Sequence, residues 1–215
     1  MRLLLLLVAG AAGAFCQPFS FGVKAGVPLT DFLTAAESQN VGYLTTTNRF
    51  IGGVTAEVRL PFGLGLEVDA LYRHLNYQES SGGSLAALIG SIAASTTASD
   101  FEFPLLGKYR FPKIKAVHPF VDAGVAFDSL AGVKQEIAMV VNGIASATAT
   151  SSPTELHNST TRGFVAGGGL DFHFLVIHIM PEIRYTRWGA QHFFDVNGLL
   201  HSNVNQGEFL LGITF

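Results

Sequence analysis

GEFLLGITF, residues 207–215, is the stretch that decides the fold, because four of its large apolar side chains fall on every second position. A β-strand has a side-chain period of two, so this stretch has one apolar face, and Glu208 points to the opposite side. One face suits lipid and the other suits a polar interior, which is the pattern of a transmembrane β-barrel strand. The apolar face consists of Phe209, Leu211, Ile213 and Phe215.

The composition of the 215-residue chain is typical of a membrane protein, with 48% hydrophobic and only 13% charged residues. The one uninterrupted apolar run, at residues 3–14, is about 12 residues long, whereas a membrane-spanning helix needs roughly 20. A closed barrel is then the architecture that satisfies every backbone polar group in lipid. The formal net charge of −3 gives no electrostatic case for binding nucleic acid.

Residues 1–16 have the layout of a secretory signal peptide, with Arg2, a leucine run and small residues at the end. Cleavage after Cys16 and cleavage after Ala14 both place small residues before the cut. We divide the chain into a signal peptide at 1–16 and a barrel domain at 17–215.

Cys16 is the only cysteine, so we expect no disulfide in the mature chain. A lipoprotein signal would also need a cysteine here, but Phe15 directly before it fits that signal poorly.

Alternation, turn residues and aromatic ends divide the mature chain into eight strand segments, an even number as this class of barrel requires. Short connectors alternate with long ones, which is typical of short periplasmic turns and longer external loops. We therefore predict an all-β fold, an eight-stranded antiparallel transmembrane up-and-down β-barrel with both termini in the periplasm. The predicted strands are 19–28, 48–60, 64–77, 100–110, 119–129, 161–172, 177–188 and 206–215.

The long connectors at 78–99 and 130–160 are rich in Ser, Thr, Ala and Gly and carry few charges, so we read them as surface loops. The stretch LAALIGSIAA, residues 85–94, could form a short helix over the rim. Aromatic rings collect at both ends of the predicted strands, among them Tyr77, Phe120 and Trp188, and we expect them in interfacial girdles.

Four stretches together resemble the small outer-membrane β-barrel domain family, the porin-like relatives of OmpA- and OmpX-type barrels. They are DFEFPLLGKYRF (100–111), GGGLDFHF (167–174), PEIRYTRW (181–188) and GITF (212–215). The resemblance implies a bacterial outer-membrane protein, inserted with the help of the barrel assembly machinery. It also implies that the last strand, through Phe209, Leu211, Ile213 and Phe215, is the assembly signal.

Charged residues of the predicted strands fall on the face opposite the lipid-facing side chains. A charge on the lipid face near the midplane costs about 2–4 kcal/mol for Arg or Lys, so this parity supports a barrel. We predict that nine acids and six bases pair across the lumen. They are Lys24, Glu57, Arg59, Glu67, Asp69, Arg73, Glu102, Lys108, Arg110, Asp122, Asp128, Asp171, Glu182, Arg184 and Glu208.

Two membrane functions fit these features. The first is a non-enzymatic, monomeric envelope protein with a structural or surface-interaction role through long external loops that meet an extracellular ligand. The second is a small, low-conductance porin, mildly cation-preferring because the lumenal acids outnumber the bases. A soluble lipocalin-like binder is the competing architecture, but it requires an apolar lumen.

No catalytic, cofactor or metal residues are assigned, and we expect no enzyme. His201 and Ser202 are adjacent and Glu208 follows, but neighbours in an extended chain point to opposite sides. His118, His173 and His178 flank two predicted turns, and we read them as solvated turn residues.

Arg162 and Arg187 have the outward parity near the loop-side ends of their strands. We expect them at the headgroup level, where arginine can bind the phosphates of lipopolysaccharide in a bidentate fashion. Ordinary snorkelling of the side chains into water is the alternative.

Overall fold

The computed structural model describes residues 19–35, 41–45, 50–81, 91–112, 117–141, 144–153, 156–174, 176–193 and 200–215. The predicted signal peptide, with both cleavage positions, lies outside these ranges. Among the described residues, no helix is both long enough and apolar enough to cross a membrane.

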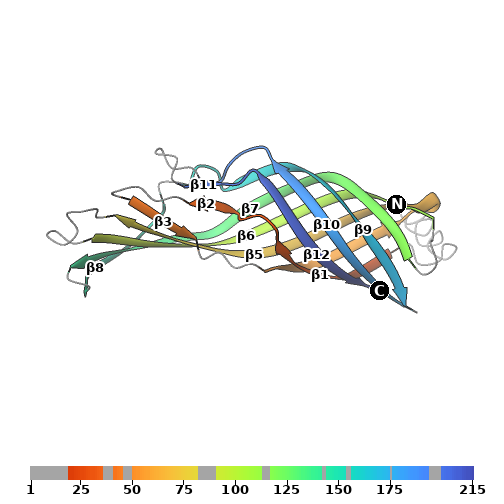
Figure 1. Cartoon of the computed structure of the whole chain (residues 1–215), viewed down its shortest axis with the longest axis horizontal. Helices are drawn as coiled ribbons and strands as arrows, with labels where there is room; N and C mark the ends of the chain where they lie inside the picture. Colours follow the sequence, from red (N-terminus) through yellow and green to blue (C-terminus); the bar gives the residue numbers. More distant parts are fainter. Residues whose placement is uncertain are drawn as a thin grey trace, which may run out of the picture.

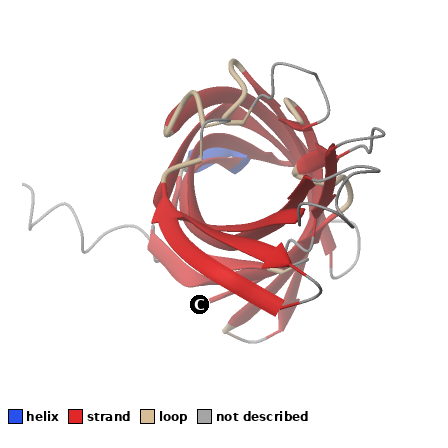
Figure 2. Cartoon of the chain, turned by 90° about the vertical axis from the view of Figure 1, so that its left-hand side faces the viewer, coloured by secondary structure: helices blue, strands red, loops and turns tan. Residues whose placement is uncertain are grey.

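Eight antiparallel strands pair in a closed ring, which confirms the predicted barrel. The ring runs from β1 through β4, β5, β6, β7, β9, β10 and β12 and returns to β1. Figure 2 looks along the barrel and shows the strands surrounding its interior. The bounds are β1 Phe19–Pro28, β4 Ile51–Arg59, β5 Leu64–Ser81, β6 Ser91–Arg110, β7 Val117–Val141, β9 Thr160–Phe174, β10 Ile177–Trp188 and β12 Asn205–Thr214.

One end of the barrel has short connections, and we call it the turn end. The 3-10 turn η1 (Pro61–Gly63) joins β4 to β5 there, with Phe62 and Gly63 at φ values of 66° and 81°. Gly63 suits this backbone because it has no Cβ, and Phe62 is one of the few non-glycine residues in this region of φ. The turn falls between the predicted strands 48–60 and 64–77, where a short connector was expected.

Side chains of the ring strands alternate between an outward apolar belt and a polar lumen. On β6, for example, Phe101, Phe103 and Leu105 are exposed, whereas Glu102 and Lys108 are buried. Three aromatic rings that were predicted in the girdles are instead buried, because they have the inward parity. These rings are Tyr77, Phe120 and Trp188.

The largest difference from the prediction lies at the other end, where strands replace two expected loops. β5, β6 and β7 continue beyond the ring, β3 (Val41–Thr45) pairs with β5, and β8 (Ile144–Ser151) pairs with β7. Figure 1 shows these strands projecting from one end of the barrel. We call β3, β8 and residues 76–81, 91–97 and 134–141 the extension sheet. The predicted helix is wrong where it can be checked, because Ser91 to Ala94 belong to β6, and residues 85–90 lie outside the described ranges.

A β-bulge marks the point where the ring passes into the extension sheet. The register of β6 against β7 shifts between Thr97 and Ser99, whose partners are Lys134 and Ala131. Two residues of β7, Gly132 and Val133, therefore oppose one residue of β6. Gly132 has φ 62°, and such bulges bend a strand and increase its twist. The bulge thus lets two long strands leave the cylinder without losing their pairing.

Candidate functional site

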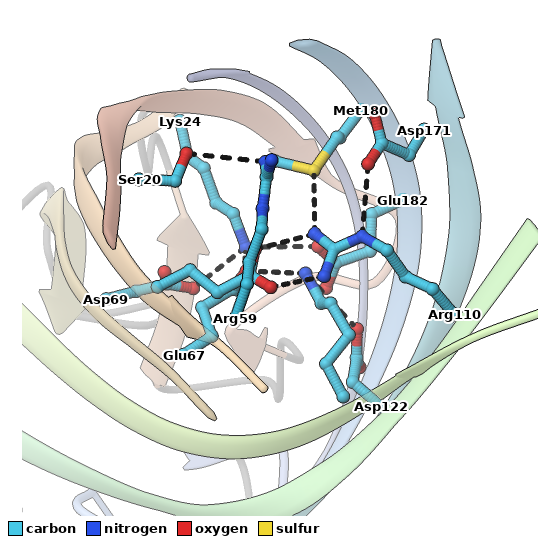
Figure 3. A network of polar contacts seen from close by, with 12 residues as sticks. Ser20, Lys24, Arg59, Glu67, Asp69, Arg110, Asp122, Asp171, Met180 and Glu182 are labelled. Atoms are coloured by element: carbon cyan, nitrogen blue, oxygen red, sulfur yellow. Dashed lines mark hydrogen bonds and ion pairs between the residues drawn. The ribbon is translucent and has the colours of Figure 1, made fainter. Parts of the chain in front are cut away.

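The lumen near the middle of the barrel holds a cluster of ion pairs, which we call the central cluster. Lys24 of β1 donates hydrogen bonds to Glu67 at 2.5 Å, to Asp69 at 3.1 Å and to Glu182 at 3.1 Å. Strands on opposite sides of the ring supply these groups, as Figure 3 shows. One ammonium group therefore connects β1, β5 and β10 across the interior.

Two further cations complete the central cluster. Arg184 donates to Asp69 at 2.9 Å and to Glu182 at 2.7 Å, and Lys108 Nζ lies 2.5 Å from Glu67 and 3.9 Å from Asp122. The side chains of Lys24, Glu67, Asp69, Lys108, Glu182 and Arg184 are 0% exposed. These six buried side chains therefore fill the lumen at this level.

A second group of pairs lies at the turn-end mouth. Arg110 donates to Asp171 at 3.0 Å and forms a bidentate pair with Glu57. His178 lies between Asp171, which is 2.8 Å from Nδ1, and Arg59, which is 3.2 Å from Nε2. If Nδ1 carries the proton, His178 donates to the carboxylate and accepts from the guanidinium group. The mouth is therefore an ordered polar network.

His178 is thus a member of a network and not the solvated turn residue that was predicted. Its ring also stacks on His173, with centroids 4.5 Å apart. Among the described residues, no group of three or more His, Cys, Asp or Glu side chains is arranged to hold a metal ion.

A third group, richer in acid, surrounds Arg73 on the other side of the central cluster. Arg73 donates to Asp100 at 2.7 and 3.0 Å and lies 3.8 Å from Glu208. Glu102 and Asp128 are buried close enough to interact with the same guanidinium group. Four carboxyl groups thus share one arginine, and several of their oxygens accept no hydrogen bond from the described residues. We call this group the acidic layer.

The sequence reasoning missed Asp100, although it has the same parity as Glu102 and Lys108 in the same strand. Asp100 is the first residue of the predicted strand 100–110, but it is absent from the predicted lumenal charges. Of the fifteen lumenal charges that were predicted, the structure buries all except Arg59 and Arg110, which are half-buried at the turn-end mouth.

A hydrophobic cap covers the acidic layer at the end that bears the extension sheet. β2 (Leu33–Ala35) pairs with β11 (Leu200–Ser202), and Phe32, Phe193 and Leu200 pack against Tyr77 and other rim side chains. We define the cap as residues 31–35, 190–193 and 200–203. The guanidinium carbon of Arg73 lies 4.6 Å from the centroid of the Phe32 ring, which joins the cap to the acidic layer.

His192 is the polar anchor of the cap, and the sequence analysis did not single it out. Its ring nitrogens lie 2.8 Å from an Asp128 carboxyl oxygen and 2.7 Å from the Asn158 carbonyl oxygen. Burial lowers the pKa of the His192 imidazole below its usual value.

Ser202 also serves the cap. Its hydroxyl oxygen accepts hydrogen bonds from the backbone N–H groups of His192 at 2.8 Å and Phe193 at 3.3 Å. Ser202 is buried and the neighbouring His201 is half-buried. Among the described residues, no hydrogen bond joins His201 to Ser202.

The remaining predicted residues lie on the outside of the barrel. Phe209, Leu211 and Phe215 are exposed on the apolar belt and Ile213 is partly exposed. Arg162 and Arg187 are exposed at the ends of β9 and β10 that face the extension sheet.

A profile of the family described as outer membrane protein beta-barrel domain matches residues 14–194. The chain belongs to this family and is an outer-membrane protein of bacteria. No curated protein sequence matches the chain.

Solved structures with the same fold include other outer-membrane proteins. The outer membrane protein OprG from Pseudomonas aeruginosa is 12% identical, with a TM-score of 0.51, and the match covers 91% of this chain and 92% of OprG. Neisserial surface protein A is 14% identical, with a TM-score of 0.47, over 92% of this chain and 96% of that chain. At 12% identity the likeness to OprG shows the fold alone.

Proposed function

We propose that the protein is a closed, non-enzymatic outer-membrane barrel that acts through the extension sheet and not through its lumen. In this proposal the turn end faces the periplasm and the extension sheet lies outside the cell. Two observations together support this proposal. Buried ion pairs fill the lumen, and several strands are much longer than a membrane-spanning strand needs to be.

Two barriers support a closed lumen. The first is the central cluster, whose charged side chains are paired across the barrel and are 0% exposed. Removing one partner of such a buried pair costs about 3–5 kcal/mol, so these side chains resist moving apart. The second barrier is the cap, which packs Phe32, Phe193 and Leu200 over the opposite mouth from the turns.

The lengths of the strands support a function outside the membrane. A transmembrane strand needs about 9–11 residues, so the 20 residues of β6 reach roughly 30 Å beyond it at about 3.3 Å per residue. β7 is longer still, with 25 residues. An ordered sheet of this size presents a fixed surface, whereas a mobile loop would first have to pay the entropy of ordering on binding.

The extension sheet offers a surface for contact. A trough of about 610 Å³ crosses β5, β6, β7 and β8. Gln78 and Glu136 lie among the small side chains Ala93, Ala138 and Thr150 that line it. A polar partner suits this lining, and the small side chains let such a partner approach the backbone closely.

The assembly role that the resemblance implied for the last strand is part of this proposal. Phe209, Leu211 and Phe215 are presented on the outside of the barrel, where another protein can reach them during insertion. Monomeric state and non-enzymatic character are also proposals. They are supported by the closed single-chain ring and by the structural use of Ser202 in the cap.

A low-conductance porin is the alternative, and the acidic layer is the observation that favours it. Four carboxyl groups around Arg73 would attract cations if the cap moved aside. The central cluster would still have to rearrange before an ion could pass.

The test is single-channel recording of the refolded mature chain in a planar bilayer, with liposome flotation to verify insertion. We expect no conductance steps from the wild type or from Phe193→Ala, which weakens only the cap. Steps from Phe193→Ala alone would make the cap a gate and favour the porin. Steps from the wild type would contradict the closed barrel.

A further inference from the structure

Two exposed arginines lie next to each other on the outer wall, close to the border between the apolar belt and the extension sheet. Arg187 of β10 pairs with Phe164 of β9, and Arg162 is two residues from Phe164 on the same face. Such diagonal neighbours on adjacent strands have Cα atoms roughly 7–8 Å apart. Two long side chains at this spacing can contact the same ligand.

These arginines differ from the cations inside the barrel in having no acidic partner. Among the described residues, neither Arg162 nor Arg187 has a carboxylate within salt-bridge distance, whereas Lys24, Arg73 and Arg184 each have at least one. Across the strands, Arg162 lies beside Phe127 and Arg187 lies between Phe164 and Asn205. Two guanidinium groups therefore stand unpaired on an aromatic surface.

A groove lies directly beside them. It has a volume of about 610 Å³, and its lining includes Phe103, Phe127, Asp128, Arg162 and Gly189, whereas Arg187 lies outside the lining on the neighbouring strand. Phe103, Phe127 and Arg162 form one row across β6, β7 and β9, because each is paired with the next. We call this feature the rim groove. It has an aromatic wall at one end and a guanidinium group at the other.

Glycine keeps the arginine end of the rim groove open. Gly189 follows β10, and its backbone N–H donates to the carbonyl oxygen of Arg162 at 2.8 Å. A Cβ atom at Gly189 would lie 3.1 Å from that carbonyl oxygen. A larger residue would therefore crowd the backbone here and narrow the groove.

The rim groove lies where lipid gives way to water. On β7 the outward side chains are apolar at Val121, Val125 and Phe127, and the next outward position is Ser129. Charged side chains destabilise a barrel much less near the interface than at the bilayer midplane. The arginines are therefore placed to meet headgroups while the aromatic wall meets acyl chains.

We propose that the rim groove binds a phosphorylated glycolipid of the outer leaflet. An acyl chain lies along Phe103 and Phe127, and Arg162 and Arg187 bind a sugar-linked phosphate. Arginine suits this task because its planar guanidinium group can donate two parallel hydrogen bonds to one phosphate. The inference rests on the proposed orientation with the extension sheet outside, but not on whether the lumen conducts.

Simple snorkelling into water makes a different prediction for the same arginines. It needs no particular lipid, so binding would not depend on the phosphate of a glycolipid.

The experiment is a binding titration of the refolded mature protein in detergent micelles, followed by native mass spectrometry. The probes are lipid A bisphosphate, the same glycolipid without phosphate, and a diacyl phosphatidic acid. We expect the bisphosphate to bind at least about tenfold more tightly than either of the other two, because only it offers both the sugar phosphate and several acyl chains.

Variants test whether the two arginines bind the phosphate. Arg162→Gln with Arg187→Gln should weaken bisphosphate binding at least about tenfold, and Arg162→Lys with Arg187→Lys should keep part of it. Lys134→Gln, an exposed cation of the extension sheet, is the matched control and should change nothing. The shift of the folded barrel on an unheated gel verifies that each variant is folded.

Equal binding of the glycolipid with and without phosphate would overturn the proposal, as would unchanged binding by the double Gln variant. Equal binding of phosphatidic acid would show that any lipid phosphate suffices and would overturn the assignment to a glycolipid. Conductance by the wild-type protein would contradict the closed barrel. The outcome of the binding titration does not depend on that measurement.

Discussion

The two halves of strand β6 show how one β-strand is adapted to two solvents. Residues 100–110, DFEFPLLGKYR, alternate between large apolar side chains that face outward and charges that face the lumen. Residues 91–97, SIAASTT, are nearly all small. The first half is held by lipid on one side and ion pairs on the other, whereas the second half is held mainly by strand pairing in water.

The backbone pairing of β6 therefore continues along both halves, while the interactions that stabilise the strand change from one half to the other. In the barrel a side chain on the wrong face meets hydrocarbon or an unpaired charge, so each position is tightly constrained. In the extension sheet one face is exposed at positions such as Ala93, Lys134 and Ala149, so a substitution on that face removes few contacts. Three experiments test this difference.

The largest effect is expected from breaking the central cluster. Arg184→Met leaves Glu182 and Asp69 without their best partner, and we expect the free energy of unfolding to fall by about 3–5 kcal/mol. Urea unfolding of the refolded protein in micelles measures this change. Lys134→Met in the extension sheet is the control, with an expected change within about 0.5 kcal/mol. Equal losses in the two variants would remove the proposed contrast.

A new charge on the lipid face should have the next largest effect. Leu105→Arg places a cation on the apolar belt, and we expect a loss of about 2–4 kcal/mol. Ala149→Arg on the exposed part of β8 should cost within about 0.5 kcal/mol, because that side chain faces water. The same unfolding measurement compares them. A stable Leu105→Arg protein would mean that this face does not meet hydrocarbon.

The smallest effect is expected at the bulge that separates the two regions. Gly132→Ala keeps the positive φ but adds a Cβ atom, which costs about 1–2 kcal/mol in the left-handed region. No atom lies within 4 Å of that Cβ position, so strain and not a clash is the cause. We expect faster hydrogen exchange in the extension sheet and unchanged exchange in the barrel strands. Uniform changes in both regions would mean that the bulge does not separate them.

The barrel could be predicted because lipid imposes a strict pattern. The predicted strands at 19–28 and 177–188 agree with β1 and β10 at both ends, since the period of two and the flanking turn residues coincide there. The lumenal placement of Lys24, Glu67 and Arg184 follows from the same period. Asp100 could also have been predicted to face the lumen, because it lies two residues before Glu102 in the same strand.

The extension sheet was missed because its residues are those of loops. Ala, Ser and Gly have low β-propensity, and long runs of them give no apolar face. One signal was present, since Asn142 and Gly143 separate Val141 from Ile144, and Asn-Gly between apolar residues is the strongest short hairpin signal. The pairing of Val141 with Ile144 agrees with it.

The sequence alone determined the class of architecture, the outward and inward faces of each strand, and the excess of acids inside. Those properties depend on the side-chain period of two in a β-strand and on the free-energy cost of placing a charged side chain in lipid. Both act on each strand separately. Only the tertiary structure decided which charges pair, that His192 and Phe193 lie in the cap, and that Arg162 lines a groove with Phe103 and Phe127. These contacts join residues far apart in the chain, so their geometry exists only after the ring has closed.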